Sequence, residues 1–199
     1  PQLYLGVDPL WDYPFPPERL AVATRGRRKP VIGYILRSGL SREKKQLLIN
    51  LRTLFGNLQL ITLSPADDRA AHELADVLGT AAPWCIRDAD TFFRFAPELT
   101  VVLSERLHGL LLAARCRIPG IGLGTDPKLH AFCHQMDWTC WRWQDPSFQL
   151  GVCTLVKELI ADPVSAYQKV RQLAEVMEEK GEEDRHWFIN QVQAMLLGG

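Results

Sequence analysis

The stretch SERLHGLLLAARCRIPGIGLGTDPK, residues 104–128, follows an apolar, β-rich run at residues 99–103. Leucine and alanine then recur at helical spacing at Leu107, Leu110, Leu111 and Ala114. GIGL, residues 120–123, has the composition of a second strand. A strand, a helix and a strand in this order predict a parallel βαβ unit. Arg106 and His108 fall where the first strand becomes the helix.

The same alternation extends on both sides of this unit. Further strands are predicted at residues 31–37, 58–64, 84–86 and 139–143, and further helices at residues 41–55, 66–79, 90–95 and 127–136. Ser41 is a candidate cap for the first of these helices, and Gly79 closes the second. The sequence therefore predicts an α/β fold, a Rossmann-like, mostly parallel sheet with helices on both faces.

Three regions differ in character along the chain. Residues 1–29 are rich in proline and predict an extended arm or interdomain linker. Residues 30–145 hold the alternating strands and helices of the Rossmann-like domain. Residues 146–199 show helical spacing only, which predicts two or three C-terminal helices that pack on the domain. The acidic stretch at residues 178–184 is expected to be a solvated helix face or a turn between helices.

Composition excludes several classes of function. Of the 199 residues 47% are hydrophobic, and 23 basic residues balance 23 acidic ones, which favours a soluble globular protein without a nucleic-acid partner. We find no long apolar run and no signal peptide. The five cysteines have no CxxC spacing, which favours free, buried thiols and a reducing, cytoplasmic compartment. The chain opens at Pro1 without a methionine, so we expect a fragment.

Polar residues end or follow four of the predicted strands, at the sheet edge where ligands of open α/β sheets bind. Ser104 is a candidate N-cap that would place Arg106 and His108 in or beside the first helical turn, whose free N–H groups attract anions. Arginine offers a planar fork to phosphate or carboxylate, and histidine exchanges a proton near neutral pH. The remaining candidates at this edge are Arg37, Ser64, Asp126 and Lys128. Individually each could be a helix cap or a solvated residue, and together they would surround one anion-binding crevice.

The order of these motifs resembles the polysaccharide pyruvyl transferase family, particularly its CsaB-like bacterial members. The resemblance rests on GVDP at residues 6–9, a strand ending in Arg37, RLHGLLLAA at residues 106–114 and IPGIGLGTDPK at residues 118–128. It spans about residues 5–138, and it departs from the family pattern at Thr125, where the family carries an aromatic residue.

The resemblance implies a two-domain GT-B architecture in which this chain is the carboxyl-terminal, donor-binding half and the N-terminal half is missing. Family members transfer pyruvate from phosphoenolpyruvate to a saccharide as a ketal, in polysaccharide and cell-wall biosynthesis. The co-substrate would be phosphoenolpyruvate, with no further cofactor and no metal. The acceptor could be lipid-linked, which would place the enzyme at the inner face of the membrane. The isolated fragment is expected to be inactive.

The resemblance assigns the Arg106, Leu107 and His108 motif to the donor site. As a hypothesis, His108 transfers the proton, and Arg106 with Arg37 neutralises charge on the departing phosphate. Ser104, Asp126 and Lys128 complete the expected substrate-binding set, in which Asp126 is more simply a helix cap.

Two other functions remain open at this stage. The crevice could hold the diphosphate of a nucleotide sugar in another GT-B enzyme, or it could be vestigial in a non-catalytic regulatory or scaffold module. A metal site at His130 and His134, which are four residues apart on one predicted helix, is a weaker alternative. The acceptor sugar and the oligomeric state are not indicated by the sequence.

Overall fold

The computed structural model describes residues 11, 29–37 and 39–197, with side chains described up to residue 186. The arm predicted for residues 1–29 therefore lies outside the described residues, apart from Trp11 and Lys29.

Six parallel strands form one sheet in the order β3-β2-β1-β4-β5-β6. The strands are β1 (Ile32–Leu36), β2 (Leu58–Thr62), β3 (Trp84–Cys85), β4 (Val101–Ser104), β5 (Gly120–Leu123) and β6 (Cys140–Trp141). In the central pairs, Ile32 of β1 is in register with Leu58 of β2 on one side and Val101 of β4 on the other. The predicted α/β, Rossmann-like fold is confirmed. Its topological switch point, where the strand order reverses, lies between β1 and β4.

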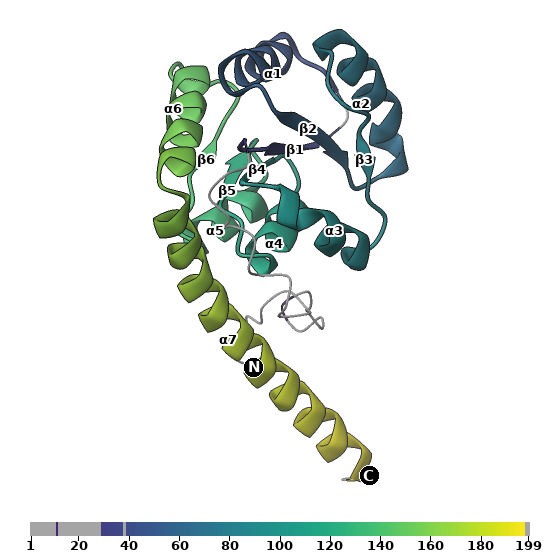
Figure 1. Cartoon of the computed structure of the whole chain (residues 1–199). Coiled ribbons are helices and arrows are strands. Elements are labelled where there is room, and N and C mark those ends of the chain that lie inside the picture. Colours follow the sequence, from purple (N-terminus) through teal and green to yellow (C-terminus); the bar gives the residue numbers. More distant parts are fainter. Residues whose placement is uncertain (1–10, 12–28, 38, 198–199) are drawn as a thin grey trace.

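Helices follow the strands in sequence and cover both faces of the sheet (Figure 1). They are α1 (Arg42–Phe55), α2 (Pro65–Leu78), α3 (Ala89–Phe95), α4 (Leu107–Arg115), α5 (Pro127–Gln135), α6 (Phe148–Ala161) and α7 (Pro163–Leu197). A 3₁₀ turn, Ala96–Glu98, follows α3. Two predicted caps are confirmed: the Ser41 side chain accepts a hydrogen bond from the Lys44 N–H, and Gly79 closes α2 with a positive φ of 59°.

Alternate side chains of each central strand enter different cores, as the pleat of a strand requires. Tyr34 and Leu36 of β1 pack with α1, α2 and α6, whereas Ile35 packs with α3 and α4 on the other face. All three side chains are fully buried. Each buried aliphatic or aromatic side chain contributes roughly 1.5–3 kcal/mol relative to exposure, so this layering accounts for the main driving force of folding.

The C-terminal region forms two helices, and the second is continuous. α6 contributes Val152 and Val156 to the core beneath it, while α7 packs through Val170 and Ala174 against α4 and α5. α7 then runs on away from the sheet (Figure 1). The prediction of a turn or solvated face at residues 178–184 is wrong for Glu178. This residue lies inside the helix and is bound by two arginines.

The two arginines, Arg115 and Arg117, come from the end of α4 and the residues after it. Their side chains are only 6% and 7% exposed, and both guanidinium groups contact the Glu178 carboxylate, Arg117 Nη2 at 2.7 Å from Oε2. Arg115 also lies over the ring of the buried Trp11, at 6.0 Å from its centroid. One buried ionic cluster therefore joins α7 to the domain.

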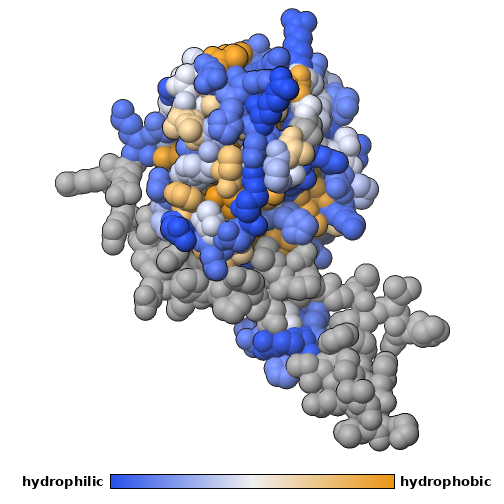
Figure 2. Space-filling model, turned by 90° about the vertical axis from the view of Figure 1, so that its right-hand side faces the viewer, coloured by the Kyte–Doolittle hydropathy of each residue, from blue (hydrophilic) through white to orange (hydrophobic). Residues whose placement is uncertain are grey.

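Hydrophilic residues cover most of the face that carries α2, β3 and α3, with apolar residues between them (Figure 2). Among the described residues, no helix combines the length and the apolar character that crossing a membrane requires.

Candidate functional site

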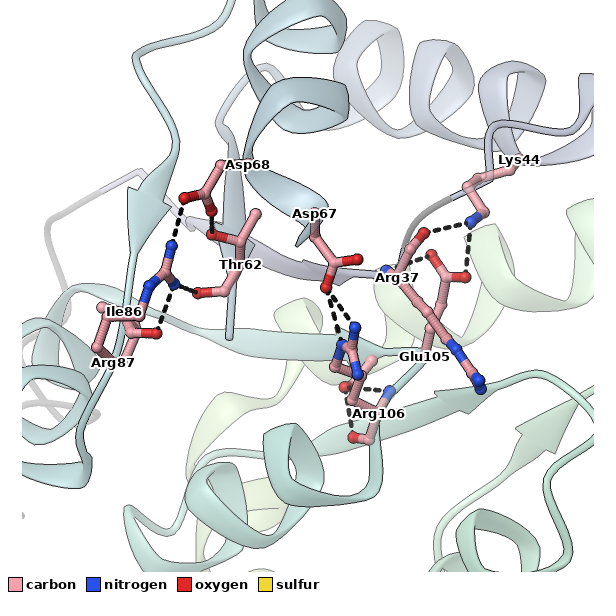
Figure 3. Close-up of polar contacts among 10 residues, drawn as sticks. Arg37, Lys44, Thr62, Asp67, Asp68, Ile86, Arg87, Glu105 and Arg106 are labelled. Carbon is pink, nitrogen blue, oxygen red and sulfur yellow. Dashed lines mark hydrogen bonds and ion pairs between the residues drawn. The ribbon is translucent and has the colours of Figure 1, made fainter. Parts of the chain in front are cut away.

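The carboxyl ends of the parallel strands bring charged residues together around the switch point. Arg37 follows β1, Asp67 lies in the first turn of α2 after β2, and Glu105 and Arg106 follow β4. Because β2, β1 and β4 are neighbours in the sheet, these residues from distant parts of the sequence lie at one edge. Figure 3 shows their arrangement.

Arg106 is held by a buried carboxylate. Its Nε and Nη2 atoms lie 3.0 and 2.5 Å from Oδ2 of Asp67, whose side chain is completely buried, while the Arg106 side chain is 29% exposed. Such charge-assisted hydrogen bonds fix the plane of the guanidinium group. Arg106 is therefore oriented in advance, with its remaining nitrogen, Nη1, left to donate to a ligand.

Ser104 does not cap the helix, contrary to the prediction. It is the last residue of β4 and is fully buried. The N-cap of α4 is Arg106, whose backbone is still extended at φ −123° and ψ 132°. The Ser104 hydroxyl instead accepts from the Arg106 N–H at 3.0 Å and donates to the Arg106 carbonyl at 2.7 Å. Ser104 thus shapes the turn that carries Arg106, and its side chain lies in the interior of the domain.

Gly109 makes this turn possible. A Cβ atom at this position would lie 2.4 Å from the Ser104 hydroxyl oxygen and 2.6 Å from Cδ1 of Ile35. These distances are too short for any side chain, so α4 can approach β4 and β1 closely only with glycine here.

Glu105 forms the centre of a buried network at the switch point. Its Oε1 accepts from the Tyr34 hydroxyl at 2.9 Å and from the Arg37 N–H at 3.4 Å, and its Oε2 lies 2.7 Å from Lys44 Nζ. Lys44 Nζ also donates to the carbonyls of Arg37 and Gly39, at 2.9 and 2.6 Å. The network ties the segment after β1 to β4 and to α1.

Burial and charge act against each other at Glu105. Burial raises the pKa of this carboxyl above its ordinary value, while Lys44 and the Tyr34 hydroxyl act in the opposite direction. Burial and the neighbouring Glu105 carboxylate raise the pKa of Tyr34 well above its ordinary value. Tyr34 is therefore a permanent hydrogen-bond donor under physiological conditions, and Glu105 is satisfied on both oxygens.

Arg37 supplies an uncompensated charge among the described residues of the site. Within residues 29–37 and 39–186 its guanidinium forms no ion pair, and it is exposed and extends away from Asp67 (Figure 3). Lys44 is paired with Glu105 and Arg106 with Asp67. Among these described residues of the switch point, the positive charge of Arg37 is therefore in excess, and its side chain is in contact with solvent.

The three residues of the RLH motif, Arg106 to His108, differ in their exposure and contacts. His108 lies in the first turn of α4 and is exposed. Leu107 packs against the apolar cluster between α4, α5 and α7, so its side chain serves the core. Of the three motif residues, Arg106 and His108 remain available to a ligand.

The other predicted residues lie at the N-termini of α2 and α5. Asp126 caps α5 by accepting from the Lys128 N–H at 2.9 Å, and both residues are exposed. Ser64 is the N-cap residue of α2 but makes no side-chain capping bond. The Nε2 atom of His130 lies 2.9 Å from the Gly124 carbonyl. The described residues include no group of three or more His, Cys, Asp or Glu side chains placed to hold a metal ion.

A second ionic group lies beside β3, apart from the switch point. Asp68 is bound by Arg87 and by the Thr62 hydroxyl, and Arg87 Nη1 donates to the Ile86 carbonyl at 2.8 Å. The bond from Arg87 holds the pKa of Asp68 below its ordinary value. Both charges of the pair are thus compensated, and this group anchors β3 to α2.

Sequence reasoning missed Asp67, Glu105 and Lys44. Each was visible as a charged residue inside a predicted apolar pattern: Glu105 directly follows β4, and Lys44 lies on the buried side of α1 with Leu47 and Leu51. A charged residue in such a position is buried only when it is paired, which is the signal that could have identified it.

A scan against protein-family models finds no match to this chain. A search of curated proteins also finds no match.

Proposed function

We propose that this chain is the donor-binding half of a phosphoenolpyruvate-dependent pyruvyl transferase that acts on a saccharide in the cytoplasm. The proposal rests on the presence of two arginines at the switch point. Arg106 is oriented by the buried Asp67, and Arg37 is exposed and forms no ion pair among the described residues. The RLH and DPK motifs support it through their order along the chain.

Phosphoenolpyruvate carries two anionic groups, a phosphate and a carboxylate, and so requires at least two donors of fixed geometry. Arg106 provides a rigid fork, and Arg37 provides a cation that can follow the ligand. The amino end of α4, beside Arg106, adds backbone N–H groups with a favourable dipole. Asp126 and Lys128 follow β5, which neighbours β4, so they lie on the same edge of the sheet and are proposed to border the same ligand.

In the proposed reaction, a proton is added to the terminal carbon of the enol, and a sugar hydroxyl attacks the carbon that bears the phosphate. The phosphate leaves, and a second hydroxyl of the same sugar closes the ketal. His108 transfers the proton, because it is the exposed titratable residue in the first turn of α4. Arg106 and Arg37 stabilise the charge that develops on the departing phosphate. The acceptor is expected to bind chiefly to the N-terminal half.

A competition experiment tests the proposal against the nucleotide-sugar alternative. Phosphoenolpyruvate, a nucleotide diphosphate sugar and inorganic phosphate are each titrated into the chain by calorimetry, and then titrated again in the presence of a saturating amount of the others. We expect phosphoenolpyruvate to bind most tightly and to be displaced by excess phosphate. Tighter binding of the nucleotide sugar would favour the glycosyltransferase alternative, and the absence of saturable binding by all three would favour the non-catalytic module.

A further inference from the structure

Two cysteines that are seven positions apart in the sequence meet beside β5. Cys133 lies on α5 and Cys140 on β6, with no CxxC spacing between them. A Cβ atom placed on Gly122 of β5 would lie 2.6 Å from the Cys133 sulfur and 2.8 Å from the Cys140 sulfur. Both sulfurs therefore occupy the space that the missing side chain of Gly122 leaves open. The two thiols are close enough for each to shift the pKa of the other.

The two thiols differ in exposure and in acidity. Cys133 is 1% exposed, whereas Cys140 is half-buried on the last strand of the sheet. The neighbouring Cys133 thiol lowers the pKa of Cys140, while that same contact and burial raise the pKa of Cys133. Arg142 also favours the Cys140 thiolate. Cys140 is accordingly the better nucleophile, and Cys133 stands next to it as a protected thiol.

We propose that Cys133 and Cys140 form a modification site, a thiol pair that hydroperoxides oxidise to an intramolecular disulfide. In the first step the Cys140 thiolate attacks the O–O bond of hydrogen peroxide, which gives a sulfenic acid on Cys140 and releases water once the leaving hydroxide takes up a proton. In the second step the Cys133 sulfur attacks the Cys140 sulfur, so that the S–S bond forms and a second water leaves. Two thiols are oxidised, and one peroxide is reduced to two waters.

The remaining cysteines lack this combination. Cys85 is exposed, with its sulfur 4.0 Å from the Pro83 carbonyl oxygen. Burial raises the pKa of Cys116, and to a lesser extent that of Cys153. If exposure alone decided which thiol reacts, peroxide would oxidise Cys85 first. The proposal predicts instead that Cys140 is oxidised first, because Cys133 lies beside it.

The disulfide would join elements that border the candidate site. Two hydrogen bonds connect β5 to β6 and the residue before it. The Gly122 N–H donates to the Thr139 carbonyl at 3.0 Å, and the Gly124 N–H donates to the Trp141 carbonyl at 2.8 Å. Gly124 leads into the turn that carries Asp126 and the start of α5. β6 is a two-residue strand at the edge of the sheet, and its one neighbour in the sheet is β5. Oxidation would thus couple the redox state of the thiol pair to the turn before α5.

The test treats the fully reduced chain with hydrogen peroxide, blocks the remaining thiols, and identifies cross-linked peptides by mass spectrometry after proteolysis without reductant. We expect the loss of two of the five thiols and one cross-linked peptide pair that contains Cys133 and Cys140, formed about tenfold faster than Cys85 is modified. Retention of both thiols at peroxide levels that modify Cys85, or a cross-link between any other pair, would overturn the proposal.

Two matched variants assign the roles. In Cys133→Ser the oxidation should stop at the sulfenic acid, which dimedone traps on Cys140, while Cys153→Ser should form the cross-link at the unchanged rate. Circular dichroism checks that each variant is folded. The role of Cys140 would be contradicted if, in the folded Cys133→Ser variant, dimedone labelled Cys140 no faster than Cys85. The cross-link in the wild type tests the proposal without any variant.

Discussion

Replacing Lys44 by methionine removes the cation from the buried network at the switch point. The Lys44 and Glu105 side chains are 5% and 7% exposed, and their charged atoms are 2.7 Å apart. Without Lys44, a buried carboxylate loses its counter-ion, and the carbonyls of Arg37 and Gly39 lose a donor. Breaking a buried ion pair from one side costs about 3–5 kcal/mol, which is a large part of the roughly 5–15 kcal/mol that stabilises a typical domain.

The pH dependence of this variant identifies the cause of the loss. A carboxyl whose pKa is raised in the folded state contributes stability below its ordinary pKa and loses that contribution as the pH rises through the folded value. Burial already raises the pKa of Glu105, and loss of Lys44 should raise it further. The deficit of Lys44→Met should therefore be largest near neutral pH and shrink at acidic pH, where Glu105 takes up a proton.

Urea unfolding followed by tryptophan fluorescence measures the free energy of unfolding at both pH values. Lys45→Met is the matched control, because Lys45 is the next residue of α1 and is exposed, so its replacement should change stability by about 0.5 kcal/mol or less. Equal stability of the two variants, or a Lys44→Met deficit that does not change with pH, would refute this account of the network.

Three further changes test other parts of the structure. Tyr34→Phe removes a hydrogen-bond donor to Glu105 and should lower the free energy of unfolding in urea by about 1–3 kcal/mol. Because the pKa of Tyr34 is raised in the folded state, the wild type should lose stability as the pH rises above the ordinary tyrosine pKa, and the variant should lose less. Glu178→Gln removes the negative charge that binds two buried arginines and should expose α7 to proteolysis and hydrogen exchange, whereas Glu179→Gln, at an exposed position, should not. Equal protection in both variants would contradict the anchoring role. Gly109→Ala places a Cβ atom 2.4 Å from the nearest side-chain atom and should destabilise the chain by about 1–3 kcal/mol, and an unchanged unfolding midpoint would show that α4 can shift freely.

The fold could be predicted from the sequence because burial on a sheet or beneath a helix imposes a period on the residues. The apolar run of β1 and the spacing of Leu47 and Leu51 in α1 each satisfy one such period, and the observed elements agree with them. Element ends were less predictable. Ser104 belongs to β4, where it is in register with Ile35 and Gly122, and its hydroxyl binds the backbone of Arg106. The close packing at Gly109 accompanies this turn, and a local capping preference does not reveal it.

The partners of the charged residues could not be predicted, because periodicity indicates which face a residue occupies but not which distant residue it meets. Arg106 and Asp67 are 39 positions apart, and Tyr34 and Glu105 are 71 positions apart. Glu178 illustrates the same limit: within an acidic stretch of a long helix it resembles a solvated residue, yet it meets two arginines that follow α4.

The central claim is that Arg37 and Arg106 form a binding site for phosphoenolpyruvate, and its most direct test is a calorimetric titration of the wild-type chain and Arg37→Ala. Arg37 is the variant of choice because its guanidinium is exposed and contributes no ion pair to the described fold. Arg94→Ala, which removes an exposed arginine of α3, is the control. We predict saturable binding that is weakened on the order of tenfold or more in Arg37→Ala and unchanged in Arg94→Ala. No binding by the wild type, or equal binding by all three proteins, would contradict the claim.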